Sequence, residues 1–105
     1  MNKVTQVKSF FYAEHEYYRT NDSKNCVPND IIANLPKCKN AIAKLGFSFV
    51  GSQSWNSRPA GCFYHNCNND GEHCSGFFNQ IIDPFKTSPL SSRHLGAVCQ
   101  RGITH

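Results

Sequence analysis

The stretch from residue 34 to residue 46 reads NLPKCKNAIAKLG, and it decides the fold of this chain. Asn34 suits the N-cap of a helix, Pro36 suits the first turn, and Gly46 suits the position after the last turn. The residues between them that share helical spacing form one apolar face: Cys38, Ala41, Ile42 and Leu45. The stretch therefore predicts a helix near residues 37–45 whose apolar face, with its cysteine, points into a core.

Short strands separated by turns are predicted on both sides of this helix. Residues 47–50 alternate between apolar and small side chains, as a half-buried strand does. Three further strand candidates follow, at residues 61–64, 76–82 and 97–99. Residues 3–18, rich in Val, Thr, Phe and Tyr, are expected to form a strand or an extended arm. We therefore expect an N-terminal strand or arm over residues 1–25 and a cysteine-rich domain over residues 26–105. The expected fold is α+β and disulfide-rich, with one helix packed on a short, mostly antiparallel sheet.

The size and composition of the chain favour a small core reinforced by covalent bonds. It has 105 residues, of which 39% are hydrophobic, and it contains six cysteines. A domain of this size buries only about two-thirds of its unfolded surface, and an even number of cysteines is typical of a disulfide framework. Six cysteines can pair in 15 ways, and the sequence alone does not choose among them. Our prediction is Cys38–Cys62, Cys67–Cys74 and Cys26–Cys99. Loop-closure entropy assigns them about 3.5, 2.5 and 4.4 kcal/mol respectively.

The sequence also suggests two metal sites, a zinc site as the rival of the disulfides and a calcium loop as the rival of a turn. Cys62, His65, Cys67 and Cys74 carry thiolate and imidazole groups that suit zinc, although the paired spacing of a zinc knuckle is missing. Residues 66–71 resemble the first half of a calcium loop, but the twelfth position is Phe77 where such a loop needs a glutamate. Because Asn, Asp and Gly are also the usual residues of a turn, we expect a turn, no metal and no cofactor.

The charge pattern argues against nucleic-acid binding. The net charge is +4, but the basic residues are scattered and form no dense stripe with interleaved aromatic residues. No apolar run is long enough for a membrane span, and Gln6 and Lys8 interrupt any signal-peptide core at the start. The cysteines suggest an oxidising environment, yet no export signal is visible at this start. Three explanations remain: a signal that was removed, a virion or other assembly oxidised after folding, or thiols that bind a metal.

From Cys38 to Cys99 the chain resembles a small cysteine-rich module of predicted surface proteins in aquatic microbial eukaryotes. The matching elements are Cys38 to Leu45-Gly46, Pro59-Ala60-Gly61-Cys62-Phe63-Tyr64, Gly76-Phe77-Phe78-Asn79 and Val98-Cys99. The chain departs from this pattern by adding Cys67 and Cys74. The resemblance leaves residues 1–25 out. It implies the fold and an extracytosolic setting, and it supplies no activity.

No motif marks a catalytic site, and we expect that the protein is not an enzyme. The aromatic residues near the turns are better candidates for binding. Trp55 lies in a polar loop beside Arg58, where an exposed indole suits a sugar ring or a protein hot spot. Packing of Trp55 over Pro59 as a cap on the core is an equal alternative. The predicted binding residues are Trp55, Arg58 and Tyr64, together with the loop over residues 64–74.

Two functions remain open from the sequence. The first is a structural component of an extracellular, cell-surface or virion assembly, built from copies of this chain or with other proteins. Its predicted interface residues are the aromatic ones of the N-terminal segment: Phe10, Phe11, Tyr12, Tyr17 and Tyr18. The alternative for this segment is an edge strand of its own domain. The second function is a module that recognises a glycan or a protein through the loop of Trp55.

Overall fold

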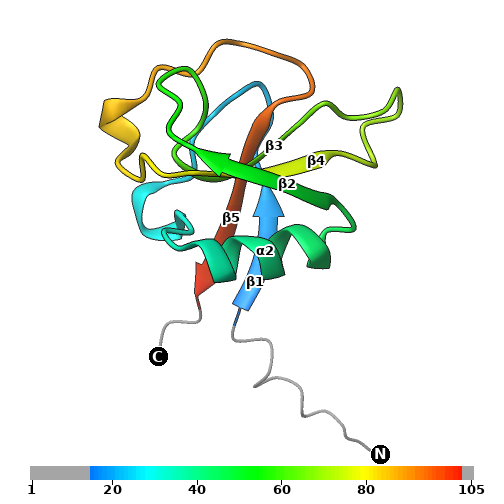
Figure 1. Cartoon of the computed structure of the whole chain (residues 1–105), viewed down its shortest axis with the longest axis horizontal. Helices are drawn as coiled ribbons and strands as arrows, with labels where there is room; N and C mark the ends of the chain where they lie inside the picture. The colour runs from blue at the N-terminus through cyan, green and yellow to red at the C-terminus, as the bar shows by residue number, and fades with distance from the viewer. Residues whose placement is uncertain (1–14, 103–105) are drawn as a thin grey trace, which may run out of the picture.

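A computed structural model describes residues 15–102 of the chain. Along the chain its elements are β1 (His15–Arg19), the 3-10 helix η2 (Pro28–Asp30), α2 (Leu35–Lys44), β2 (Ser48–Gln53), β3 (Gly61–His65), β4 (Ser75–Asn79), the 3-10 helix η3 (Pro84–Lys86) and β5 (Gly96–Gly102). Figure 1 shows α2 lying along one side of the sheet, while most of the long loops lie away from the helix. Within the described residues no helix has the length and apolar character needed to cross a membrane.

The helix α2 forms where the sequence predicts it, and it begins two residues earlier than expected. The side chain of Asn34 caps its first turn by accepting a hydrogen bond from the backbone N–H of Lys37 at 2.9 Å. Gly46 follows the last turn with φ of +80°, a conformation that glycine adopts without strain. The predicted apolar face is turned inward: Cys38, Ala41 and Ile42 are buried, and Leu45 is partly buried.

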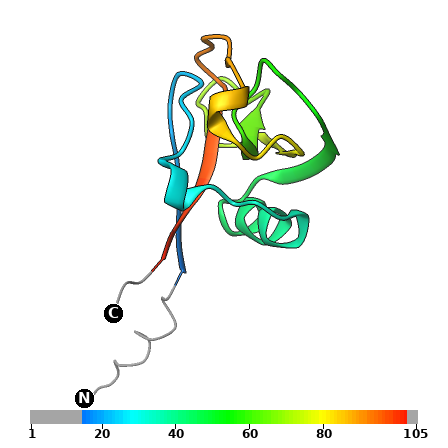
Figure 2. The same cartoon turned by 90° about the vertical axis from the view of Figure 1, so that its left-hand side faces the viewer.

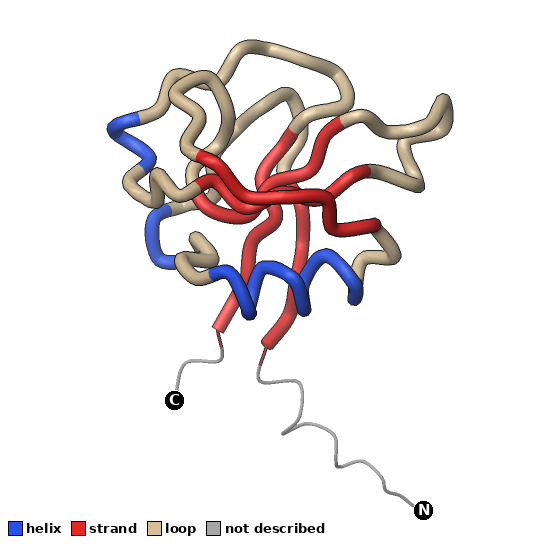
Figure 3. The backbone as a smooth tube through the Cα atoms, in the orientation of Figure 1, coloured by secondary structure: helices blue, strands red, loops and turns tan. Residues whose placement is uncertain are grey.

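In the described part of the chain five strands form one mixed sheet in the order β1-β5-β3-β4-β2. Three neighbouring pairs are antiparallel, and β2 runs parallel to β4. Figure 2 shows β1 and β5 side by side, and in Figure 3 these two strands pass behind the helix while the other strands lie above it. The predicted α+β architecture, one helix on a mostly antiparallel sheet, is therefore confirmed.

Alternation along the strands gives the sheet two different faces. Cys62 and Tyr64 of β3 and Phe78 of β4 belong to the core cluster that contains the buried residues of α2. We call this side of the sheet the helix face. The α-carbon of Gly76 lies so close to Ile42 that an added Cβ would come within 2.4 Å of its side chain. A glycine here lets the helix sit directly on β4.

Three disulfides connect the elements, and they are the pairs that the sequence predicts. Cys38–Cys62 ties α2 to β3, Cys67–Cys74 closes the connection between β3 and β4, and Cys26–Cys99 ties the segment before η2 to β5. No free cysteine remains. Three disulfides in a compact small domain are consistent with a stable protein of an oxidising, extracellular environment.

The end of the N-terminal segment belongs to the sheet. Residues 15–19 form the edge strand β1, which pairs with β5 along its whole length. Tyr17 packs against the helix-face core, and Tyr18 packs near the Cys26–Cys99 disulfide and donates a hydrogen bond to Asp30. Tyr17 and Tyr18 therefore lie in an edge strand of their own domain, which is the alternative that the sequence left open for this segment. The other predicted interface residues, Phe10, Phe11 and Tyr12, lie outside the described residues.

Candidate functional site

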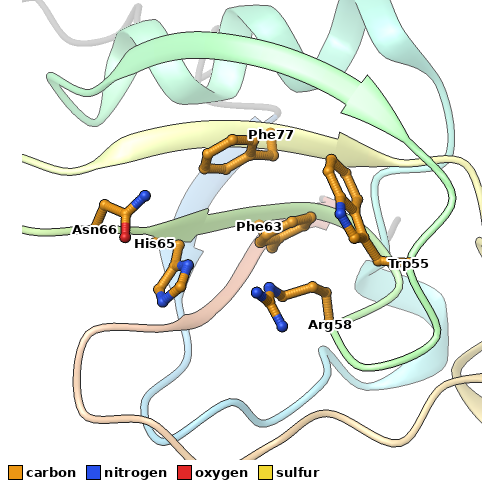
Figure 4. Close-up of a pocket in the computed structure, with 6 residues that line it drawn as sticks. All are labelled: Trp55, Arg58, Phe63, His65, Asn66 and Phe77. Atoms are coloured by element: carbon orange, nitrogen blue, oxygen red, sulfur yellow. The ribbon is translucent and has the colours of Figure 1, made fainter.

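A small pocket opens on the sheet face opposite α2. Its volume is about 250 Å³, and three segments contribute its walls: the loop between β2 and β3, the end of β3, and β4. The lining residues are Trp55, Arg58, Phe63, His65, Asn66 and Phe77. Figure 4 shows aromatic rings along one side of this pocket and polar side chains along the other. We call it the Trp55 pocket.

Three aromatic rings build the apolar wall. Phe63 and Phe77, from neighbouring strands, stack with their ring centroids 5.2 Å apart and their planes 16° from parallel. The indole of Trp55 meets both rings edge-on, at 5.3 Å and 5.9 Å. Phe63 is buried, whereas Phe77 and Trp55 are half-buried. Edge-to-face and offset-stacked contacts are favourable aromatic geometries. The wall is therefore fixed by packing while part of the indole stays open to a ligand.

The polar side of the pocket is cationic. One terminal nitrogen of Arg58 donates to the backbone oxygen and the hydroxyl of Ser57, at 3.2 and 3.3 Å. Among residues 15–102 no carboxylate lies within ion-pair distance of Arg58. The pKa of His65 is lowered, first by burial and then by the nearby charges of Arg58 and His94. Burial and the neighbouring Arg58 and His94 thus favour the neutral form of the His65 ring.

Asn79 holds the loop that carries Trp55. This side chain is fully buried at the end of β4. Its amide oxygen accepts hydrogen bonds from the backbone N–H groups of Trp55 and Ile81, at 3.0 and 3.1 Å. Its amide nitrogen donates to the backbone oxygens of Trp55 and Pro59, at 2.8 and 2.9 Å. One buried amide thus satisfies both ends of the loop, so Asn79 is a positioning residue for the Trp55 pocket.

The bonds of Asn79 also correct one strand prediction. The sequence predicted a strand over residues 76–82, whereas β4 ends at Asn79. The side chain of Asn79 bonds the backbone two residues further on, which is the pattern of an Asx turn and ends the strand. The role of this residue was missed from the sequence. The only signal was its place at the end of the Gly76-Phe77-Phe78-Asn79 motif.

Two of the three predicted binding residues line the pocket, and the third does not. Trp55 belongs to its aromatic wall and Arg58 to its polar side. Tyr64 is only 2% exposed and belongs to the helix-face core, so its assignment as a binding residue is wrong. The physical reason is alternation: Phe63 and His65 point to the pocket side, which turns Tyr64 to the other face. Its hydroxyl donates to the backbone oxygen of Thr20 at 2.6 Å, and burial raises its pKa.

The loop over residues 64–74 contributes to the pocket only at its start, through His65 and Asn66. The rest forms a turn closed by the Cys67–Cys74 disulfide. There the side-chain oxygen of Asn68 accepts from the backbone N–H groups of Glu72 and His73, at 3.1 and 3.2 Å. This agrees with the turn interpretation of the calcium-like stretch.

The zinc alternative conflicts with the disulfides. Cys62, Cys67 and Cys74 are each bonded to another cysteine, so they cannot supply the thiolates that it requires. In the part of the chain that the structure describes, no three His, Cys, Asp or Glu residues are grouped so as to hold a metal ion.

Comparison of this chain with protein-family models, with curated proteins and with solved structures finds no match. The resemblance to the cysteine-rich surface module therefore stays a prediction.

Proposed function

We propose that this domain is an extracellular, non-enzymatic recognition module that binds one ring of a glycan in the Trp55 pocket. The observation that carries the proposal is the preformed aromatic wall with hydrogen-bond donors opposite it. A sugar ring has an apolar C–H face and a polar rim of hydroxyl groups. The half-buried indole of Trp55 can pack against the C–H face, and Arg58 and Asn66 can form hydrogen bonds with the hydroxyl groups.

The size of the pocket limits the ligand to a small group. Sites for drug-sized ligands usually occupy about 300–1,000 Å³. The Trp55 pocket, at about 250 Å³, lies just below that range and suits one ring of a longer chain. A small site of this kind predicts weak binding of single sugars and tighter binding of multivalent glycans.

The proposal includes no catalysis. In the described residues, no carboxylate faces His65 or Arg58 in the pocket, and every cysteine is bonded in a disulfide. A glycoside hydrolase generally needs two carboxyl groups flanking the bond it breaks. The lining residues supply contacts and hydrogen bonds, which are sufficient for recognition.

A glycan array tests the proposal. The wild-type domain is expected to bind a subset of the glycans. Trp55→Ala is expected not to bind them, because the substitution removes the exposed part of the aromatic wall. Phe85→Ala is the matched control, since Phe85 is a highly exposed aromatic residue outside the pocket lining. Retention of the same glycans by Trp55→Ala, or no retention by the wild type, would contradict the proposal.

A second candidate function, a structural component of an assembly, is supported by a different region. Phe85 is 89% exposed and Leu90 is 64% exposed on the loop that follows β4. Exposed apolar residues grouped on one segment favour contacts with another protein. The predicted interface at Phe10, Phe11 and Tyr12 lies outside the described residues and is tested separately.

Sedimentation velocity tests the assembly function. Association of the full chain at micromolar concentration, abolished in Phe85→Ser/Leu90→Ser, would support it. Truncation of residues 1–14, which leaves β1 intact, measures the contribution of the N-terminal segment separately. A wild-type protein that stays monomeric under these conditions would count against the assembly function.

A further inference from the structure

We infer that the sugar ring taken by the Trp55 pocket is anionic, with a carboxylate or sulfate group read by Arg58. This inference rests on the proposed function and specifies its ligand class. It starts from the charge of the pocket lining, which contains one arginine, one histidine and no acidic residue.

The charge of Arg58 is not compensated by the described part of the protein. The ion pair found among residues 15–102 joins Arg101 to Glu16, on the β1–β5 pair. Arg58 is partly buried, and its bonds to Ser57 occupy only one of its three guanidinium nitrogens. A partly desolvated cation without an acidic partner costs free energy unless an anion completes the site. The free N–H groups of the guanidinium are therefore available to a ligand.

The position of Arg58 matches the geometry of an acidic sugar. Figure 4 shows the guanidinium and the ring of His65 on one side of Phe63, with Phe77 on the other and Trp55 at the end of the pocket. A ring packed on the indole would direct a substituent at its rim toward Arg58. The planar fork of a guanidinium binds carboxylate and sulfate-like oxygens with two parallel hydrogen bonds. A neutral hydroxyl group engages it more weakly.

The groups around the site favour negative charge as well. Burial lowers the pKa of His65 most, and the neighbouring Arg58 and His94 lower it further. Asp70 and Glu72 belong to the turn beyond the pocket. There the carboxylate of Asp70 accepts a hydrogen bond from the backbone of Glu72 at 2.9 Å. No acidic side chain of the pocket lining opposes an anion.

Calorimetric titration with three oligosaccharides of equal length tests the inference: one with uronate rings, one with sulfated rings and one neutral. Binding of at least one anionic oligosaccharide should be about tenfold tighter than binding of the neutral one, as a charged hydrogen bond implies. Because the chain contains one Trp, a change in its fluorescence on binding locates the ligand at the pocket.

Arg58→Gln should remove the preference and bind anionic and neutral oligosaccharides alike. Lys39→Gln removes the same charge from α2, on the opposite face, and should keep the preference. Equal affinity of the wild type for all three oligosaccharides would overturn the inference and leave the proposed function intact. An unchanged preference in Arg58→Gln would also overturn it. Failure of all three to bind, together with an empty glycan array, would overturn both.

Discussion

The two faces of the sheet carry similar aromatic side chains but differ in what covers them. On the helix face, α2 lies against β4 and is bonded to β3 through Cys38–Cys62. Tyr64 and Phe78 are buried there as core residues. On the other face loops replace the helix, and Trp55 remains half-buried beside a pocket. Whether an aromatic residue becomes core or site is thus decided by the element that packs over it.

The pocket face is nevertheless held firmly. Cys26–Cys99 anchors the segment before η2, and Cys67–Cys74 anchors the turn after β3. Asn79 fixes the backbone of the Trp55 loop from within. A binding site loses less free energy on association when its residues are already ordered. The two disulfides and the hydrogen bonds of Asn79 therefore allow an open pocket to keep its shape without a covering helix.

Removing the disulfide of the helix face should destabilise the protein more than removing the disulfide of the turn after β3. Cys38→Ala/Cys62→Ala should lower the free energy of unfolding by about 3.5 kcal/mol, because it releases a loop with a sequence separation of 24. Cys67→Ala/Cys74→Ala, with a separation of 7, should cost about 2.5 kcal/mol. Urea denaturation measures both. A larger loss for the shorter loop would contradict the loop-entropy account.

A pair of single substitutions separates stability from binding. Ile42→Ala should cost about 2–5 kcal/mol because the side chain is fully buried between α2 and the sheet, while glycan affinity stays unchanged in the folded fraction. Trp55→Ala should have the reverse effect, with a smaller loss of stability and a complete loss of binding. Thermal unfolding and calorimetric titration measure the two properties. Equal loss of binding in both variants would mean that the two faces are not independent.

Asn79→Ala should weaken both properties. The substitution leaves buried backbone groups of the Trp55 loop without partners, at about 1–3 kcal/mol. The indole should become more exposed, and its fluorescence maximum should move to longer wavelength. Gln80→Ala is the control, because the side chain of this exposed neighbour bonds only the side chains of Ser52 and Ser54. A fluorescence spectrum unchanged in Asn79→Ala would exclude the positioning role.

The smallest effect is a pH dependence due to His65. Its pKa in the folded protein lies below the ordinary value of 6.5, so the unfolded chain takes up the proton first. Its contribution to stability is present above pH 6.5 and is lost as the pH falls below that value. Between pH 7.5 and pH 5 the free energy of unfolding, measured by urea denaturation, should therefore decrease less in His65→Gln than in the wild type. Parallel curves would contradict this assignment.

Much of the fold could be predicted because its signals are local. The stretch from residue 34 to residue 46 carries its own cap, apolar face and terminating glycine, so α2 follows from it. The predicted cysteine pairs are also the ones that form, although the sequence contains no pattern that decides among the 15 possible pairings. The parallel pairing of β2 with β4 could not be predicted, because it depends on a contact between segments that are not consecutive in the chain.

The pocket could be predicted only in part. Trp55 and Arg58 stood out in a polar loop, but Phe63 and Tyr64 are neighbours with similar side chains. Which of them faces the pocket depends on the side of the sheet on which α2 docks. The hydrogen bonds of Asn79 to Trp55 and Pro59 link residues about twenty positions apart, and no local sequence pattern predicts them.

A nuclear magnetic resonance titration tests the central claim most directly, because it observes both faces at once. Backbone amide shifts would be followed while a glycan selected on the array is added to the wild-type protein. We predict that the largest shifts occur at Trp55, Arg58, His65 and Asn66, and that the amides of α2 stay unchanged. Shifts concentrated on α2 or on β1, with none at the Trp55 pocket, would contradict the assignment of the open face as the recognition face.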